Sequence, residues 1–318
     1  MRFLAALLCV LFTQAAWAQS DGLHWLQRIH AATQKLSYSG TFVYQNRQQS
    51  ETSLIVHAVG SHGVRERLET LDGEPREIIR TGDEVKCYEP GSMTVKIDKQ
   101  ADRQVFPALL PANLQEITAH YAVKKGAVER VAGFDCQVIV LEPKDKMRYG
   151  HKLWADLSSG MLLKAKTFDE KGEEVEQFAF TQIAIGGPIA KELLASRLSA
   201  RARDWRVENS AGVATSLAAS GWTVKPEVPG FRKVTEMKRT QGGSSQVRHV
   251  VYSDGMAAVS VFIEPMATKT PSSQTGWSRQ GAINIYSRQV ANHLVTVVGE
   301  APAESVKKIA DSVEYRKP

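Results

Sequence analysis

Apolar and polar residues alternate along most of this 318-residue sequence, and a repeat of two residues predicts β-strands. The pattern is clearest between Gly221 and Met266, where one alternating run over 247–253 is followed by a second over 257–264. Asp254-Gly255 lies between them and is typical of a two-residue hairpin turn, because both residue types tolerate positive φ. We therefore predict three strands joined by two turns in this stretch.

Strand-like segments also follow one another from Ser37 to Ile185, with helical spacing of apolar residues over Gly22–Leu36 and Phe106–Tyr121. Hairpin-length gaps between the strands favour an antiparallel sheet over alternating strands and helices. The fold class is accordingly α+β and mostly antiparallel β, with one large, strongly curved sheet and helices on its concave side. Such a sheet can enclose an apolar cavity, although an ordinary core has the same aromatic and aliphatic stripe.

The first 18 residues have the features of a secretory signal peptide, with Arg2, an apolar run over 3–12 and the small residues of Ala16-Trp17-Ala18. We therefore expect export, with the periplasm as the compartment. Residues 19–199 form the predicted large domain, and residues 200–220, which are poor in apolar residues, form a mobile linker. Residues 221–318 form a small domain, an antiparallel sheet of five strands covered by one helix.

The excess of positive charge lies in the small domain. Residues 221–318 hold 13 basic and 8 acidic side chains, whereas residues 19–220 hold 26 of each. Five basic residues lie between 232 and 248 with Glu236 as the one acidic residue among them. This cluster is either ordinary solvated surface or a face for an acidic partner or anionic lipid. Nucleic acid is not expected as a partner of an exported protein.

Two cysteines, Cys87 and Cys136, remain once the predicted signal peptide is removed. In an oxidising compartment such a pair can form a disulfide, and two buried free thiols are the alternative. Their spacing matches neither a metal site nor a redox Cys-x-x-Cys motif.

Sequence motifs that carry catalysis are absent. The sequence has no Gly-x-Ser-x-Gly, His-Glu-x-x-His, Walker-type or Gly-x-Gly-x-x-Gly motif, and its eight histidines are scattered. We therefore expect a non-enzymatic binding protein with no catalytic residue, no cofactor and no metal.

Several stretches together resemble one family. They are Ser37 to Tyr44, Val64 to Leu68, Tyr149 to Trp154, Gly221 to Pro265 and Asn292 to Lys308. The combination covers essentially the whole chain after residue 18. It resembles the RseB family, called MucB in pseudomonads, of periplasmic negative regulators of the envelope-stress sigma factor.

The resemblance implies a large domain similar to lipoprotein carriers of the LolA and LolB type, an unclosed β-barrel with helices, and a small sheet domain with one helix. It implies binding to a membrane-bound anti-sigma factor of the RseA or MucA type, which is thereby shielded from regulated proteolysis. It further implies release by lipopolysaccharide or lipoprotein acyl chains, and no cofactor. A LolA-type lipid carrier is the alternative, and an envelope enzyme acting on glycolipid or polysaccharide is the third class.

Strand parity and the helical insertion suggest which residues line a lipid cavity in the large domain. These are Tyr38, Phe42, Tyr44, Leu54, Val56, Phe106, Leu109, Leu110 and Leu114. The basic cluster of the small domain is the predicted partner-binding set. It comprises Arg232, Lys233, Lys238, Arg239 and Arg248. The sequence leaves open whether the chain forms a homodimer.

Overall fold

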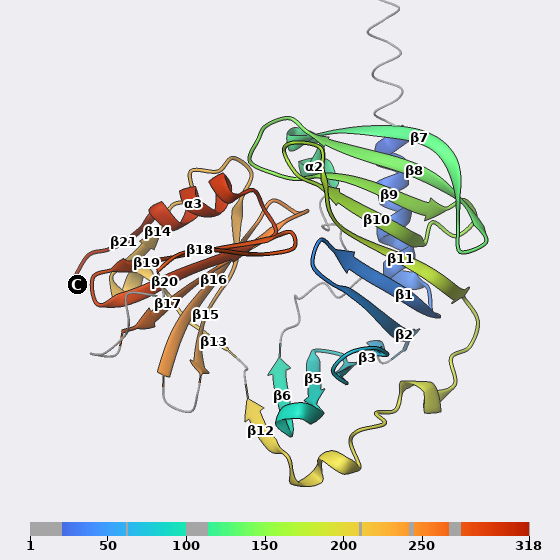
Figure 1. The fold of residues 1–318 in the computed structure, drawn as a ribbon, viewed down its shortest axis with the longest axis horizontal. Helices are drawn as coiled ribbons and strands as arrows, with labels where there is room; N and C mark the ends of the chain where they lie inside the picture. Colours follow the sequence, from blue (N-terminus) through green and yellow to red (C-terminus); the bar gives the residue numbers. More distant parts are fainter. Residues whose placement is uncertain are drawn as a thin grey trace, which may run out of the picture.

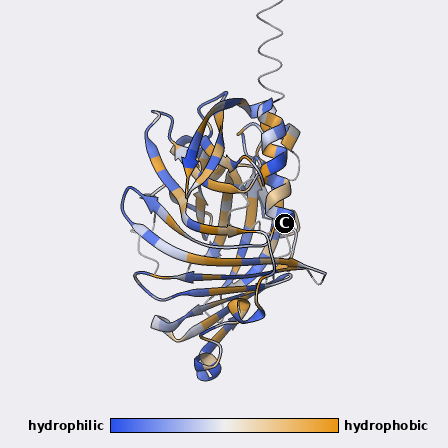
Figure 2. Cartoon of the chain, turned by 90° about the vertical axis from the view of Figure 1, so that its right-hand side faces the viewer, coloured by the Kyte–Doolittle hydropathy of each residue, from blue (hydrophilic) through white to orange (hydrophobic). Residues whose placement is uncertain are grey.

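The computed structural model describes residues 21–61, 63–99, 114–209, 212–241, 245–266 and 275–317, and the predicted signal peptide at 1–18 lies outside them. The chain is mostly β, with two large sheets and few helices (Figure 1). Along many strands hydrophilic and hydrophobic residues alternate (Figure 2), as the sequence pattern predicts. Among the described residues, no helix combines the length and apolar character that crossing a bilayer requires.

The first sheet has twelve strands in the order β12-β6-β5-β4-β3-β2-β1-β11-β10-β9-β8-β7. Neighbours are antiparallel apart from β12, which pairs parallel with β6. The outermost strands β7 and β12 are not paired with each other, so the predicted unclosed barrel is confirmed. The strands are β1 (Tyr38–Asn46), β2 (Ser50–Gly60), β3 (Gly63–Thr70), β4 (Glu77–Thr81), β5 (Glu84–Glu89), β6 (Thr94–Lys99), β7 (Tyr121–Val131), β8 (Phe134–Pro143), β9 (Gly150–Asp156), β10 (Leu162–Phe168), β11 (Glu174–Ile185) and β12 (Arg206–Asn209).

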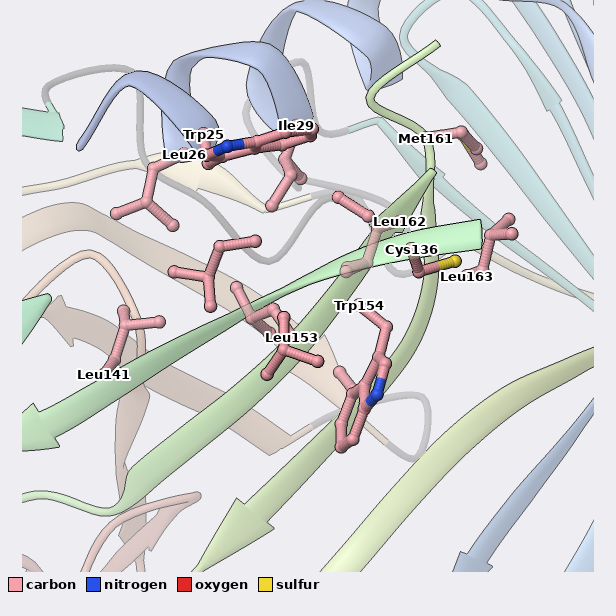
Figure 3. Packing of buried hydrophobic residues seen from close by; sticks show 14 of the residues in the cluster. Trp25, Leu26, Ile29, Cys136, Leu141, Leu153, Trp154, Met161, Leu162 and Leu163 are labelled. Atoms are coloured by element: carbon pink, nitrogen blue, oxygen red, sulfur yellow. The ribbon is translucent and has the colours of Figure 1, made fainter. Parts of the chain in front are cut away.

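Helices cover the inner face of this sheet. Residues 21–35 are helical, in agreement with the sequence pattern, and Leu26 and Ile29 pack in one buried cluster with Leu141 and Leu153 of the sheet (Figure 3). The short helix α2 (Leu114–His120) adds Ile117 to the same cluster. It is the described part of the predicted helical insertion, whose earlier residues lie outside the described part of the chain.

The outer face of β2–β6 is covered by the chain that follows β11, which we call the return segment (residues 189–209). It contains the 3-10 helices η2 (Lys191–Leu194) and η3 (Arg201–Asp204) and ends in β12. Arg67 and Glu77 form a buried ion pair on this face, and Glu77 also accepts hydrogen bonds from the Ser196 hydroxyl and the Arg197 amide. Because a buried carboxylate needs such partners, these contacts hold the return segment against the sheet.

The second sheet has seven strands in the order β13-β15-β16-β17-β20-β19-β18, and the predicted number of five was wrong. One extra strand, β13, comes from the predicted linker, and the other, β18, is formed by residues 276–280, while β14 pairs instead with β21 near the C-terminal end. The strands are β13 (Val213–Ala214), β14 (Trp222–Val224), β15 (Arg232–Gln241), β16 (Ser245–Ser253), β17 (Ala258–Pro265), β18 (Gly276–Gln280), β19 (Ile283–Val290), β20 (His293–Gly299) and β21 (Val313–Tyr315).

One helix, α3 (Ala303–Asp311), covers one face of the second sheet as predicted, and its residues Val306 and Ile309 pack against Val295 and Val297. The hairpin predicted at Asp254-Gly255 is present, but β16 and β17 are joined by four residues rather than two. The Asp254 carboxylate accepts hydrogen bonds from the backbone amides of Met256 and Ala257, and these bonds stabilise the longer turn.

The predicted linker contributes to both sheets. Its first part supplies η3 and β12, which pairs with β6 over four residues from Arg206 to Asn209. Its second part supplies β13, which pairs with β15, and the 3-10 helix η4 (Ala218–Ser220). The described parts of residues 200–220 are therefore hydrogen-bonded to an edge of each sheet.

The two cysteines are free, so the disulfide alternative was wrong. Cys87 lies in β5 and Cys136 in β8, and seven strands separate β5 from β8 in the sheet order. Neighbouring strands are about 4.8 Å apart, whereas a disulfide needs Cα atoms within about 7 Å.

Arg148 connects the two domains. It lies in the loop between β8 and β9, its side chain is fully buried, and its guanidinium donates to the fully buried Asp254 carboxylate over 2.6 Å and to the Pro229 carbonyl over 2.5 Å. Asp145, beside it in the same loop, accepts a third hydrogen bond from the Arg148 side chain at 3.0 Å. The ring of Phe231 lies 5.8 Å from the guanidinium carbon. The guanidinium of Arg148 thus pairs a buried cation of the large domain with a buried anion of the small domain.

Further polar contacts surround Arg148. The Ser305 hydroxyl of α3 donates to the Met147 carbonyl over 2.6 Å, and the Asn284 amide donates to the Tyr149 hydroxyl over 2.9 Å. The loop 145–149 of the large domain is thus bonded to four separate parts of the small domain: Pro229 before β15, the β16–β17 turn, β19 and α3.

Replacing Arg148 with Ala should leave Asp254 buried without its cation, at a cost of about 3–5 kcal/mol. Arg76→Ala is the matched control, since Arg76 is 46% exposed and pairs with Glu51, whose side chain is 35% exposed; its cost should stay below about 1 kcal/mol. Urea unfolding followed by tryptophan fluorescence compares the two variants. Equal transition midpoints for both would contradict the role of Arg148.

Candidate functional site

Aromatic side chains of β1 and β11 form a continuous cluster on the inner face of the large sheet. The ring centres of Phe42 and Phe180 are 5.7 Å apart, and those of Tyr38 and Phe180 are 6.3 Å apart, both edge-to-face. Phe178 continues the cluster at 6.5 Å from Phe42. Cross-strand pairing produces this arrangement, because Phe42 lies opposite Phe180 in the ladder. The cluster is the strongest candidate surface for an apolar ligand in the large domain.

A polar row crosses the same face towards the small domain. Tyr44 donates to Glu176 over 2.8 Å, and the Thr167 hydroxyl donates to the other Glu176 oxygen over 3.2 Å. Since Thr167 uses its hydrogen there, its oxygen is left to accept from the His151 Nδ1 at 3.4 Å. Burial lowers the pKa of His151 to about 4 and raises the pKa of Glu176. At neutral pH His151 is therefore an uncharged member of this row.

A buried histidine–glutamate pair, His57 of β2 and Glu66 of β3, lies beside Tyr38, the first residue of β1. The Nδ1 of His57 is 3.0 Å from the Glu66 carboxylate, and the His57 ring stacks on Tyr38 at 4.8 Å with an angle of 15° between the planes. Burial and the nearby Glu66 charge raise the pKa of Tyr38 well above its usual value. The isolated sequence gave no signal for this pair, since His57 and Glu66 meet through pairing of β2 with β3.

The structure places only some of the predicted cavity residues together. Tyr38, Phe42 and Leu114 are buried in the inner cluster, and Tyr44 packs at its margin. The prediction that Leu54 and Val56 line the cavity was wrong. In the register they lie opposite Thr41 and Ser39, on the outer face of the sheet. A parity error of one residue moves a side chain to the other face of a sheet. Phe106, Leu109 and Leu110 lie outside the described residues.

Ile55 is an apolar inner-face residue of β2 that the sequence pattern did not predict. It lies opposite Gly40, is fully buried and belongs to the inner cluster. Val56 faces the return segment instead, where it lies opposite the buried Arg67 of β3. Both residues are buried and apolar, so hydrophobicity alone could not have separated them.

The predicted basic set does not form one free patch. Arg232 pairs with Glu116 of α2 over 2.5 Å and Arg239 pairs with Asp98 of β6 over 3.2 Å, so both contact the large domain. Lys233 pairs with Glu236 in its own domain. Lys238 and Arg248 lie directly opposite each other on β15 and β16, and neither has a carboxylate partner among the described residues.

Other kinds of site have little support in the described part of the chain. No group of three or more His, Cys, Asp or Glu residues there could hold a metal ion. A pocket of about 720 Å³ opens at the rim of the large sheet, but polar and charged residues such as Glu51, Asp72 and Arg76 line most of it. It is therefore unsuited to an acyl chain.

Comparison with known proteins gives matches over nearly the whole length. Residues 21–198 match the MucB/RseB N-terminal domain, and residues 216–314 match the MucB/RseB C-terminal domain. The sigma factor AlgU regulatory protein MucB of Pseudomonas aeruginosa is 32% identical over 316 residues, which cover 98% of this chain and 95% of that protein. The sigma-E factor regulatory protein RseB of Escherichia coli K12 is 25% identical over 308 residues, covering 96% and 94%.

Solved structures agree with the sequence matches. MucB in the Pseudomonas aeruginosa MucA/MucB complex superposes with a TM-score of 0.72 at 29% identity, covering 94% of this chain and 100% of that one. A second crystal structure of MucB gives a TM-score of 0.70 at 28% identity, covering 93% of this chain and 98% of that one. The resemblance inferred from the sequence is thereby confirmed: with both domains matched in order, this chain belongs to the MucB/RseB family.

Proposed function

We propose that this chain is a non-enzymatic regulator in the periplasm that binds the periplasmic part of a MucA- or RseA-type anti-sigma factor. One observation carries the proposal: a relative that matches both domains of this chain has been solved in complex with the periplasmic part of MucA. The predicted signal peptide supports the compartment. Bound in this way, the regulator would shield the anti-sigma factor from proteolysis.

The same proposal assigns lipid sensing to the inner face of the large domain. Acyl chains of lipopolysaccharide or of a lipoprotein would bind along the aromatic side chains of β1 and β11, since these side chains offer a large apolar area. A lipid that binds best to the partner-free form must weaken partner binding by the same factor. The contacts of Arg148 with Asp254 and Pro229 offer a route for this coupling, because they join the two domains.

Lys238 and Arg248 are the part of the predicted basic set that we retain for contact with an acidic partner. Their side chains project from directly opposed positions of β15 and β16. Two like charges this close repel each other, so an acidic group from a partner would relieve a local cost. Arg232, Lys233 and Arg239 already have carboxylate partners and are less available.

The purified periplasmic segment of the anti-sigma factor should bind the mature chain, and lipopolysaccharide should weaken that binding. Isothermal titration calorimetry with and without lipopolysaccharide measures both effects. A lipid carrier would bind the lipid and leave the anti-sigma segment unbound. Failure of the folded chain to bind the segment under any condition would contradict the regulator assignment.

The double variant Lys238→Glu/Arg248→Glu reverses both charges. It should bind the anti-sigma segment roughly tenfold or more weakly than the wild type, and the loss of affinity should be larger at low salt. Lys225→Glu is the matched control, because Lys225 is an exposed lysine of the same domain with no ion pair among the described residues. Binding measured at two ionic strengths tests the assignment. An equal effect of the control and the double variant would remove Lys238 and Arg248 from the interface.

Phe42→Ala should reduce acyl-chain binding, whereas Leu54→Ala should preserve it, because Phe42 lies on the inner face and Leu54 on the outer face. Displacement of a fluorescent fatty acid measures the affinity, and circular dichroism confirms that both variants fold. If Leu54→Ala lost the lipid and Phe42→Ala kept it, the ligand would bind elsewhere.

A further inference from the structure

Strand β18 is at one end of the seven-stranded sheet and pairs with β19 on one side only. All five of its residues are exposed, so no described part of the chain covers its free edge. In an edge strand, the backbone N–H and C=O groups of alternate residues point away from the neighbouring strand and can pair with another extended chain. β18 therefore offers a backbone surface that can accept one more strand.

The other free edges of the two large sheets are protected against such pairing, whereas β18 is not. β7 carries a bulge between Lys125 and Val128, β12 has four residues that include Arg206 and Glu208, and β13 has only two residues. Bulges, charges and short strands are the usual devices that keep sheet edges apart. β18 pairs in register with β19 over all five residues, contains no proline and has Arg279 as its one charged residue.

Trp277 gives this edge an exposed aromatic side chain. It lies opposite Tyr286 of β19 with the ring centres 4.6 Å apart, and it is 48% exposed. No other aromatic side chain in the described ranges is exposed to this extent. Aromatic residues that are partly packed and partly in water are enriched where proteins bind one another. A strand added beside β18 would cover the remaining surface of Trp277.

The charge around β18 favours an acidic partner. The hairpin of β18 and β19, residues 276–290, contains Arg279 and Arg288 and no acidic residue. Arg279 donates to the Gly281 carbonyl over 3.0 Å and Arg288 to the Ala310 carbonyl over 3.0 Å, and neither has a carboxylate partner among the residues that the structure describes. A second copy of this chain on the same edge would bring two such hairpins of like charge together, which is unfavourable.

We propose that an extended, acidic segment of the protein partner docks on the free edge of β18 as an additional strand, with one side chain against Trp277 and a carboxylate on Arg279. The inference rests on the partner binding proposed above and adds the edge and the conformation of the bound segment to it. Main-chain hydrogen bonds would supply affinity, and the two side chains would supply specificity. Lys238 and Arg248 lie on β15 and β16, towards the other end of the sheet order, so the two contacts can be tested separately.

The double variant Trp277→Ala/Arg279→Glu tests this edge. It should bind the periplasmic segment of the anti-sigma factor about tenfold or more weakly than the wild type, with the larger loss at low salt. Val128→Ala/Arg130→Glu is the matched control, because Val128 is 53% exposed and Arg130 is exposed two residues further along the free edge strand β7; it should bind like the wild type. Calorimetry on the full mature chain at two ionic strengths measures the affinities, and circular dichroism checks that both variants fold.

Hydrogen exchange of the wild type gives a second measurement that needs no substitution. The amides of residues 276–280 should exchange about tenfold or more slowly in the complex with the anti-sigma segment, because an amide in a paired strand exchanges only when the strand opens. The amides of residues 121–131, in the other edge strand, should exchange at an unchanged rate. This measurement decides if the double variant does not fold.

The outcomes separate this inference from the proposed function. Binding that survives the folded double variant, or a complex that leaves exchange at residues 276–280 unchanged, overturns the β18 site and leaves the regulator assignment in place. Protection of these residues that grows with the concentration of the chain alone shows pairing of two copies and also overturns the acidic segment. Failure of the folded wild type to bind the anti-sigma segment overturns both proposals.

Discussion

The buried ion pair between Arg148 and Asp254 is the constraint on which the arrangement of the two domains depends. Two fully buried charges are costly unless each has its partners, and here the partners come from both domains. Arg148 also donates to Pro229, and Asp254 also closes the β16–β17 turn. Separating the domains would break all of these hydrogen bonds together and leave both charges without a partner. The contact between the domains is therefore held by one interdependent set of bonds.

A second buried pair performs the corresponding task within the large domain. Arg67 and Glu77 hold the return segment on the outer face of β2–β6, and Tyr88, Val95 and Ala202 pack there as a small apolar cluster. The same chain then pairs with β6 and with β15. The edge strand β6 of the large sheet is therefore connected to the edge of the small sheet by hydrogen bonds and by the chain between them.

The two faces of the large sheet consequently have different surroundings. The inner face carries the aromatic cluster, with the His57–Glu66 pair at one end and the Tyr44–Glu176 row at the other. The outer face binds the chain's own return segment. A ligand on the inner face and a partner on the small domain would be linked through elements that this chain provides itself, and binding energy at one site can then alter affinity at the other.

The sequence by itself determined the local elements: the period-two strands, the N-terminal helix, the hairpin at Asp254, the final helix and family membership. Alternation and turn residues act over a few positions, so they can be read directly. It did not determine the inward face of β2, the separation of Cys87 from Cys136, or the carboxylates that neutralise Arg232 and Arg239. Only the tertiary structure decided these, because strand register and ion pairs such as Arg148–Asp254, 106 residues apart, depend on long-range packing that no local pattern encodes.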